Sequence, residues 1–250
     1  MTKSIRVVSY NIHKGFTHFN RRMVIHDLRE RLRSLQADVV FLQEVQGSHA
    51  THGGRWHDWP SAPQYEFLAD EVWSDFAYGK NAVYDHGHHG NAILSRYPIV
   101  ASENLDVSAH AFESRGLLHA QIAVPGLAAP VHLMCVHLAL FEHSRQRQLA
   151  MLIKRVHETV PDTSPLIIAG DFNDWRGQAG RKFATELGLE EAFMSVHGQT
   201  AKSFPAHFPL LSLDRIYVRG WRVVNAQVLQ AGDGWHRSDH AALLATLELE

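Results

Sequence analysis

The chain has 250 residues, 45% of them hydrophobic, so it is long enough to bury a sizeable core. Its 24 basic and 26 acidic residues give a formal net charge of -2, which excludes the strongly basic surface of a non-specific nucleic-acid binder but not a local basic groove. The single cysteine, Cys135, excludes an intrachain disulfide and favours a reducing compartment, so we expect a cytoplasmic protein. We expect neither a secretory signal nor a transmembrane segment, because no run approaches the roughly 20 apolar residues that cross a bilayer.

Hydrophobic periodicity predicts strands and helices along the whole chain. In chain order, we expect a strand at 4–10, a helix at 21–36, a strand at 39–43, a long segment rich in Gly, His and Trp at 45–63, a helix at 64–74, a short strand at 92–94, strands at 117–124 and 131–137, a helix at 143–159, a strand at 166–170, a helix at 178–187, and strands at 213–218, 222–230 and 240–247. Strand pairs joined by short turns and mixed with helices favour a mixed sheet. No repeat or linker divides the chain, which predicts one domain over residues 1–250.

Several predicted strands end abruptly in a polar side chain. Asn11, Glu44, His137 and Asp171 each follow an apolar run of strand type. A buried strand needs no polar terminus for stability, whereas ligands bind where strand ends converge in layered α/β architectures. We therefore expect these side chains, which are far apart in sequence, to form one polar site.

The segment 167–174, Ile-Ile-Ala-Gly-Asp-Phe-Asn-Asp, is the strongest single motif. In an extended or gently bent backbone, Asp171 and Asn173 point to the same side. The carboxylate can then take a proton from a water while the amide fixes that water or a substrate oxygen. An Asx-rich turn after a buried strand is an equally good interpretation.

Two further acids are candidate metal ligands. Glu44 follows a run that is expected to be buried, so its carboxylate is either solvated or bound to a cation, and oxygen ligands of this kind suit Mg²⁺ or Mn²⁺. Asp239 precedes His240, and a bend before the last strand can present both, with Asp239 on a metal and His240 on a phosphate oxygen. The alternative for Ser238 and Asp239 is a simple cap.

Asp214 lies inside an otherwise β-type run, where a carboxylate needs a partner. His240 is one candidate, since a carboxylate keeps an imidazole oriented and protonated; an arginine is the alternative. His137 shares a strand face with Cys135 and is either structural or functional. Arg115, just before a strand, can meet an anion or remain solvated.

In combination, these motifs resemble the endonuclease/exonuclease/phosphatase superfamily, which has the fold of pancreatic-type deoxyribonuclease. The resemblance covers residues 5–247 and is carried, in family order, by residues 9–15, 42–45, 90–99, His137, 170–173, 213–216 and 238–240. It implies an α+β fold: a four-layer sandwich of two packed mixed sheets with helices outside and the site at one end of the sheets.

The resemblance also implies a role for each site residue in metal-dependent hydrolysis of a phosphodiester. Glu44 would ligate Mg²⁺ (or Mn²⁺), with Asn11 and Asp239 as ligand or support, and Asp171 would activate the attacking water, which Asn173 orients. His137 and His240 would bind the scissile phosphate as cationic imidazoles, with Asp214 holding His240. Asn11 and Arg115 would also contact the substrate. No covalent protein intermediate is required, so Cys135 is not expected to act as a nucleophile.

The substrate stays open within the superfamily. Repair enzymes carry an acidic residue where this chain has His13 and a Trp/Tyr/Arg-rich element where it has residues 203–211, so abasic-site repair is disfavoured. A nuclease-type phosphodiesterase is the first interpretation, and a phospholipid or sphingomyelinase-like phosphodiesterase or a small-molecule phosphatase is the alternative. A non-catalytic phosphate-binding module would be expected to lack Glu44, Asp171 or His240. No obligate protein partner is indicated.

Two segments are expected to influence substrate choice. Residues 46–63, with Trp56 and Trp59, form either a lid or an ordered surface loop stabilised by its own tryptophans. Residues 85–89, with three histidines, form either a metal or phosphate site or a flexible polar loop.

Overall fold

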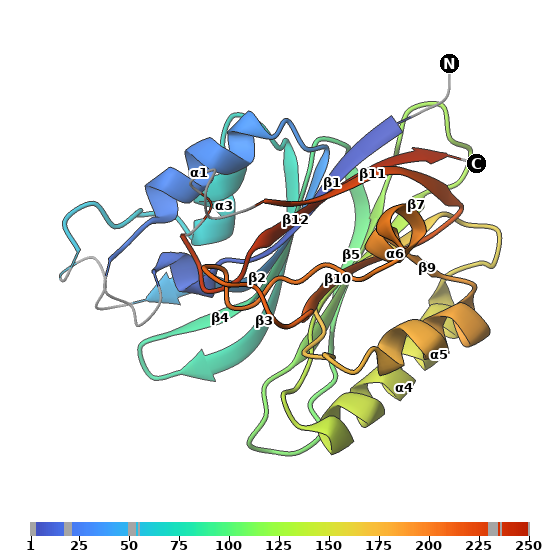
Figure 1. Ribbon diagram of the computed structural model, residues 1–250. Helices are drawn as coiled ribbons and strands as arrows, with labels where there is room; N and C mark the ends of the chain where they lie inside the picture. The colour runs from blue at the N-terminus through green and yellow to red at the C-terminus, as the bar shows by residue number, and fades with distance from the viewer. Residues whose placement is uncertain are drawn as a thin grey trace.

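The computed structural model describes residues 4–17, 22–49, 54, 56–229, 235 and 237–249. Over these residues, two mixed β-sheets of six strands each pack face to face, and helices cover their outer faces (Figure 1). This arrangement confirms the predicted α+β sandwich of four layers.

The strands and helices have the following bounds. The first sheet consists, in spatial order, of β11 (Trp221–Leu229), β12 (Ala242–Leu249), β1 (Ser4–Asn11), β2 (Val39–His49), β4 (Gly87–Ser95) and β3 (Asp75–Tyr84). The second consists of β5 (Ile99–Asp106), β6 (Gly116–Ile122), β7 (Val131–His137), β8 (Leu166–Asp171), β10 (Asp214–Arg219) and β9 (Glu190–Glu191). The helices are the 3-10 turn η1 (His13–Gly15), α1 (Ile25–Ser34), α3 (Gln64–Ala69), α4 (Glu142–Thr159), α5 (Gln178–Leu187) and α6 (Ala192–His197).

The apolar strands are buried on both faces, which explains why they read as continuous hydrophobic runs. Along β1, Ile5 and Val7 face the core between the two sheets, whereas Val8 and Tyr10 face the core beneath α1 and α3. A third core lies between the second sheet and helices α4 and α5. Because each sheet is covered on both faces, polar side chains gather at the strand ends.

Several elements match the predicted bounds closely. The hairpin of β6 and β7 and the helices α4 and α5 lie where the sequence predicts them. The two other predicted helices are shorter than expected, with α1 starting at Ile25 and α3 ending at Ala69. Residue 21, where the first of these was expected to start, lies outside the described residues.

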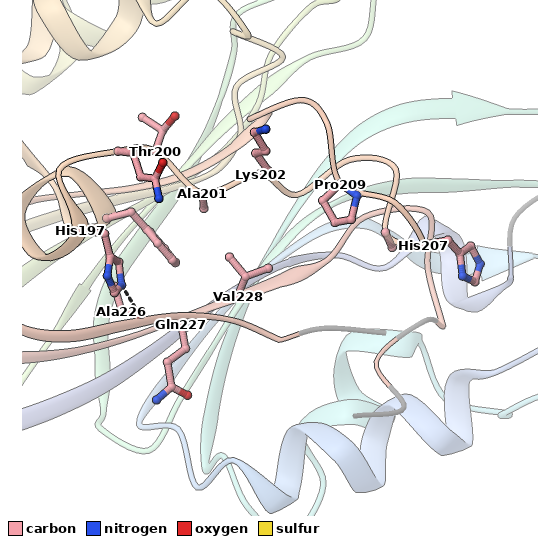
Figure 2. A pocket seen from close by; sticks show the side chains of 12 residues that line it. His197, Thr200, Ala201, Lys202, His207, Pro209, Ala226, Gln227 and Val228 are labelled. Carbon is pink, nitrogen blue, oxygen red and sulfur yellow. Dashed lines mark hydrogen bonds between the residues drawn. The ribbon is translucent and has the colours of Figure 1, made fainter. Parts of the chain in front are cut away.

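The strands β3, β5 and β9 and the helix α6 were not predicted. β5 is an edge strand whose side chains are mostly exposed, so it carries no hydrophobic alternation. α6 has six residues, which is less than two helical turns and leaves little room for a repeated apolar spacing. It packs on β10 and β11 at one edge of the sandwich, and the connection that follows it faces β11 across a groove (Figure 2). No helix among the described residues has the length and hydropathy of a membrane span.

Candidate functional site

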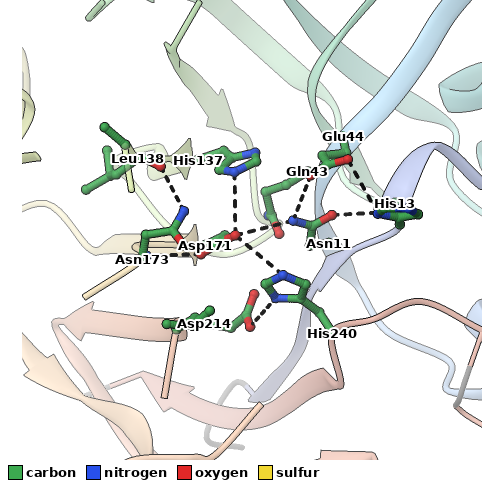
Figure 3. A network of polar contacts seen from close by, with 12 residues as sticks. Asn11, His13, Gln43, Glu44, His137, Leu138, Asp171, Asn173, Asp214 and His240 are labelled. Atoms are coloured by element: carbon green, nitrogen blue, oxygen red, sulfur yellow. Dashed lines mark hydrogen bonds and ion pairs between the residues drawn. The ribbon is translucent and has the colours of Figure 1, made fainter. Parts of the chain in front are cut away.

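Strand register brings the polar strand ends together at one end of the two sheets (Figure 3). In the second sheet, Asp171 at the end of β8 pairs with His137 on β7 and with Asp214 on β10. In the first sheet, Asn11 at the end of β1 pairs with Gln43 on β2. The two sheets therefore present residues from across the sequence to a common space.

Asp171 lies at the centre of this space and is 2% exposed. Its Oδ2 accepts a hydrogen bond from Asn11 Nδ2 at 3.3 Å and lies 3.5 Å from His137 Nε2 and 3.8 Å from His240 Nε2. Its Oδ1 accepts from the backbone N–H of Asn173 at 3.0 Å. One carboxylate thus contacts side chains from both sheets, which is the arrangement expected of a single polar site.

Asp171 is the last residue of β8, and an Asx turn directly follows it in place of the extended or gently bent chain that the sequence suggested. Gly170 has φ 147°, and a Cβ atom at this position would lie 2.0 Å from the carbonyl oxygen of Val136, so only glycine fits. Asn173 is left-handed, with φ 50°, and its Nδ2 donates to the Leu138 carbonyl at 2.9 Å. The Asx turn and the clustered polar site are therefore both present.

Asp214 and His240 form a buried pair. Asp214 is fully buried, and its Oδ2 lies 2.8 Å from His240 Nδ1. Burial lowers the pKa of His240, but the carboxylates of Asp214 and Asp171 outweigh this effect and raise the pKa to about 10. His240 is therefore an imidazolium at neutral pH, and its partner is the one that the sequence suggested for Asp214.

Burial also shifts the pKa values of the other two titratable groups at the centre, Asp171 and His137. Burial raises the pKa of Asp171 to about 6, so the group is both ionised and basic at neutral pH. Burial and then the neighbouring Arg115 hold the pKa of His137 well below its usual value. Of the two imidazoles predicted to be cationic, His240 contacts two carboxylates, Asp214 and Asp171, whereas His137 contacts only that of Asp171.

Glu44 sits at a β-bulge, not at the end of a strand. β2 continues to His49, but its pairing with β4 shifts between Leu42 and Val45, and Glu44 has φ 56°. Such a bulge re-aims a side chain, and a left-handed backbone at a non-glycine residue is a strain that clusters at functional sites. Its carboxylate lies 3.5 Å from Asn11 Nδ2 and 3.8 Å from Lys14 Nζ.

Glu44 and Asp239 flank the same imidazole, but with His13 they do not place three donor atoms within 4.8 Å of one another. His13 Nδ1 lies 3.9 Å from a Glu44 oxygen and 3.4 Å from Asp239 Oδ1. Both carboxylates are partly exposed, and the Asn11 amide contacts Glu44 from one side. This oxygen-donor set suits a hard divalent ion. Asp171, Asp214 and His240 do place donor atoms within 4.8 Å of one another, but His240 Nδ1 is already committed to Asp214.

The pocket around the site has a volume of about 420 Å³, and five cationic or imidazole side chains line it: Lys14, His89, Arg115, His137 and His240. Arg115 lines it, and its buried Nε has no hydrogen-bond partner among the described residues. His89, which the sequence placed in a polar loop, lies on β4 and also lines the pocket. Its spacing of two from Asn91, which is buried between the sheets, was the signal that both share a strand face.

An apolar wall forms the rest of the pocket. Leu140, Trp175, Phe204 and Leu211 line it, and Leu140 is 61% exposed. The Trp175 ring lies 5.1 Å from the guanidinium of the wholly buried Arg145, which also donates to the Leu140 carbonyl at 2.9 Å. Arg145 therefore fixes both sides of this wall, which can accept an apolar or flat group.

The two predicted substrate-selecting segments behave differently from one another. The Trp56 and Trp59 rings lie 5.5 and 5.7 Å from the Phe16 ring, which fits an ordered surface loop, although residues 50–53 and 55 lie outside the described residues. The histidine-rich segment forms the turn between β3 and β4 and the start of β4. Within the described part of the chain, these histidines form no metal-sized cluster.

The chain was compared with known proteins. The sequence model of the Endonuclease/Exonuclease/phosphatase family matches residues 8–240. YbhP of Escherichia coli K12, an uncharacterized protein, is 51% identical over 246 residues, which cover 98% of this chain and 97% of YbhP. The 39% identity to a UPF0294 protein of Erwinia tasmaniensis covers only 34% of this chain.

Solved structures are similar over nearly the whole chain. An endonuclease/exonuclease/phosphatase from Beutenbergia cavernae has a TM-score of 0.81 at 20% identity, covering 99% of this chain and 72% of that one. The human nocturnin catalytic domain with bound sulfate has a TM-score of 0.77 at 19% identity, covering 100% and 97%. D. rerio TDP2 complexed with single strand DNA product has a TM-score of 0.72 at 20% identity, covering 98% and 99%. At these identities the similarity shows a shared fold.

Proposed function

This chain belongs to the endonuclease/exonuclease/phosphatase family, and from that premise we propose that it hydrolyses a phosphodiester by metal-dependent, in-line attack of water. The observation that carries the proposal is the buried Asp171 carboxylate, which contacts Asn11, His137 and His240 at once. A carboxylate in this setting is both basic and close to groups that bind an anion. Such an enzyme would be a phosphoric ester hydrolase.

Asp171 would act as the general base. Its pKa of about 6 leaves it ionised at neutral pH yet basic enough to take a proton from water. Asn173, whose amide nitrogen is held by the Leu138 carbonyl, would turn its Oδ1 toward that water. The fixed turn therefore supplies both the acceptor and the orientation that attack requires.

The phosphate would lie between His240, His137 and Arg115. His240 would donate from Nε2 as an imidazolium while Asp214 holds its Nδ1, and Arg115 would meet a phosphate oxygen through its guanidinium, whose buried Nε has no partner among the described residues. Glu44, with Asn11 and Asp239, would hold Mg²⁺ or Mn²⁺. When bound, such an ion would neutralise charge that builds on the phosphate oxygens.

We propose a nucleic acid as the first substrate class. The similar TDP2 structure contains a single strand DNA product, and the exposed face of Trp175 beside the pocket could stack on a base. The exposed Leu140 favours the alternative, a phospholipid or another phosphodiester with an apolar group. No obligate protein partner is proposed.

Two broader proposals follow from the same residues. The site combines side chains from β1 to the start of β12, so we propose that residues 1–250 form one domain.

The Cys135 thiol is buried and accepts a hydrogen bond from Gln43 at 3.3 Å, and burial raises its pKa to about 12. This thiol is poorly suited to act as a nucleophile, and we propose a reducing compartment such as the cytoplasm.

Hydrolysis of bis(p-nitrophenyl) phosphate tests the proposed function. We expect turnover with Mg²⁺ or Mn²⁺ and none after EDTA treatment, with recovery when the metal is restored. A panel of single-stranded DNA, RNA, abasic duplex DNA, sphingomyelin, phosphatidylglycerol and inositol phosphates under the same metal would then rank the substrate classes. Turnover that is insensitive to EDTA would contradict metal dependence.

Replacing His89 should weaken substrate binding. The buried His89 Nδ1 lacks a hydrogen-bond partner among the described residues, and burial and then Lys14 lower the pKa of this imidazole to about 4, so it is neutral. We expect His89→Leu to lower kcat/KM about 3- to 10-fold, mainly through KM, because the variant would lose a neutral hydrogen bond to the substrate. Steady-state kinetics on bis(p-nitrophenyl) phosphate measure this.

His88→Leu is the matched control for His89→Leu. Its Nδ1 lies 3.0 Å from the Tyr78 hydroxyl, so it is engaged away from the pocket, and it should keep kcat/KM within about twofold of wild type. Equal losses in the two variants would mean that His89 acts through the β3–β4 hairpin and not through the substrate.

A further inference from the structure

A second and larger cavity lies behind the segment that borders the catalytic pocket. It has a volume of about 780 Å³ and runs between β11 and residues 199–209, and we call it the β11 groove (Figure 2). Its labelled side chains come from α6, from the 199–209 segment and from β11. None of the roles proposed for hydrolysis uses them.

The floor of the β11 groove is apolar and hollow because its side chains are small. Ala201, Ala206 and Ala226 line it, and each is at most 3% exposed. The Phe193 ring, Pro209 and Val228 complete the apolar lining. Three methyl groups in positions where larger side chains would fill the space leave room for an apolar ring or a short chain.

The rim of the β11 groove carries positive and hydrogen-bonding groups. Lys202, His197 and His207 lie around it, and none of the described lining residues is acidic, although the chain has 26 acidic residues. The His197 Nε2 donates to the Ala226 carbonyl at 2.7 Å, so Lys202 supplies the fixed positive charge among the described lining residues. An apolar floor beneath such a rim is complementary to a ligand with an apolar body and an anionic head.

One segment contributes to both the β11 groove and the catalytic pocket: Lys202 and Ala206 line the groove, and Phe204 between them lines the pocket. Ala206 N donates to the Asp239 carbonyl at 2.8 Å, and Ala241 N donates to the Ser203 carbonyl at 2.8 Å. The Phe204 ring lines the catalytic pocket with its centroid 5.0 Å from that of His240. A ligand that shifts this segment would therefore move the backbone on both sides of His240.

We propose that the β11 groove binds an amphipathic anion, with a phosphoryl, sulfonyl or carboxylate head and an apolar ring or short chain, and that its occupancy changes turnover through residues 203–206. Binding stands on the geometry of the groove alone. The effect on turnover rests on the proposed hydrolytic function.

Calorimetric titration with four probes tests the binding. We expect octyl phosphate or 1-naphthyl phosphate to bind at least about tenfold tighter than inorganic phosphate, and octyltrimethylammonium not to bind. The chain and ring probes distinguish a lipid-like ligand from a flat aromatic one. Equal affinity for the amphipathic anions and inorganic phosphate would overturn the proposal.

Three variants locate the binding site. Lys202→Glu reverses the charge of an exposed rim residue, and Ala226→Leu fills the floor, so each should weaken octyl phosphate binding about tenfold or more. Lys182→Glu makes the same charge change beside α4, away from the groove, and should bind like wild type. Undiminished binding in both groove variants would assign the site elsewhere and overturn the proposal.

Turnover of bis(p-nitrophenyl) phosphate tests the coupling. Saturating octyl phosphate should change kcat at least about twofold in wild type and in Lys182→Glu, and not in Ala226→Leu. Purely competitive inhibition that persists in Ala226→Leu would place the ligand in the catalytic pocket and overturn the coupling. Failure of the enzyme to turn over with any metal would refute the proposed function, while the titrations would still decide whether the groove binds its ligand.

Discussion

Asp171→Asn is expected to reduce phosphodiester hydrolysis by roughly 10²- to 10⁴-fold while the fold stays intact, because that is the contribution of a positioned general base. An amide has the shape of the carboxylate and can still accept the hydrogen bond that Asn173 N donates to Oδ1. It cannot take a proton from water, and it removes the negative charge beside His137 and His240. The loss should therefore appear in kcat, measured under saturating metal.

Asp174→Asn is the matched control for Asp171→Asn. Asp174 is equally buried and lies three residues away, but its Oδ2 accepts from Ala179 N at the start of α5, so it serves the helix. Its kcat should stay close to wild type. Circular dichroism and thermal melting would show whether both variants are folded. More than a tenth of wild-type turnover in folded Asp171→Asn would exclude this residue as the base.

Hydrophobic periodicity predicted most of the elements and a mixed sheet, whereas the four-layer sandwich was predicted from the resemblance to the family. Buried runs such as 166–170 and the helical stripe of α4 have a clear period, so their elements lie where they were expected. β5 could not be found this way, since a strand at a sheet edge with exposed side chains is locally indistinguishable from a loop. Tertiary pairing with β6, and not local preference, makes it a strand.

Most members of the site could be named from the sequence, but their geometry could not be predicted. An enclosed carboxylate must find a partner, which made His240 one candidate for Asp214, with an arginine as the alternative. The bulge that re-aims Glu44 depends on the pairing of β2 with β4, and the residue type alone does not reveal that Glu44 has a positive φ. The lowered pKa of His137 depends on burial and on Arg115, both of which require three-dimensional neighbours. His89 was missed because β4 begins earlier than its apolar residues.

Asp214→Asn is expected to lower kcat at pH 8 by roughly 10²-fold or more, because His240 would lose the partner that keeps it charged. In the wild type, burial lowers the pKa of His240, and the carboxylates overcome this and raise it to about 10. Without the Asp214 charge, burial would still lower the pKa of His240, and only the weaker effects of Asp171 and Asp239 would raise it. The pKa of His240 should then fall, and the imidazolium that meets the phosphate should be lost at a lower pH.

The pH dependence of kcat distinguishes this effect from general damage. Wild-type kcat should rise as Asp171 ionises near pH 6 and fall as His240 deprotonates near pH 10. In Asp214→Asn the alkaline fall should move to lower pH, while the acidic limb changes little. Asp38→Asn is the control, since the Asp38 Oδ2 accepts from Arg6 N at 2.8 Å, away from the site, and it should leave both limbs in place.

The pair of Asp214 and His240 should also make the free energy of unfolding depend on pH, with higher stability at lower pH. Because folding raises the pKa of His240, the stabilisation from its charge is fully present below the unfolded pKa of about 6.5 and is lost as pH rises through about 10. Asp214→Asn should remove this dependence and lower the free energy of unfolding at pH 7 by about 1–3 kcal/mol, the penalty for a buried polar group without its partner. Urea unfolding at pH 6, 8 and 10 measures it. A variant whose stability deficit is as large at pH 10 as at pH 6, with an unmoved alkaline limb, would show that His240 is not held as an imidazolium by Asp214.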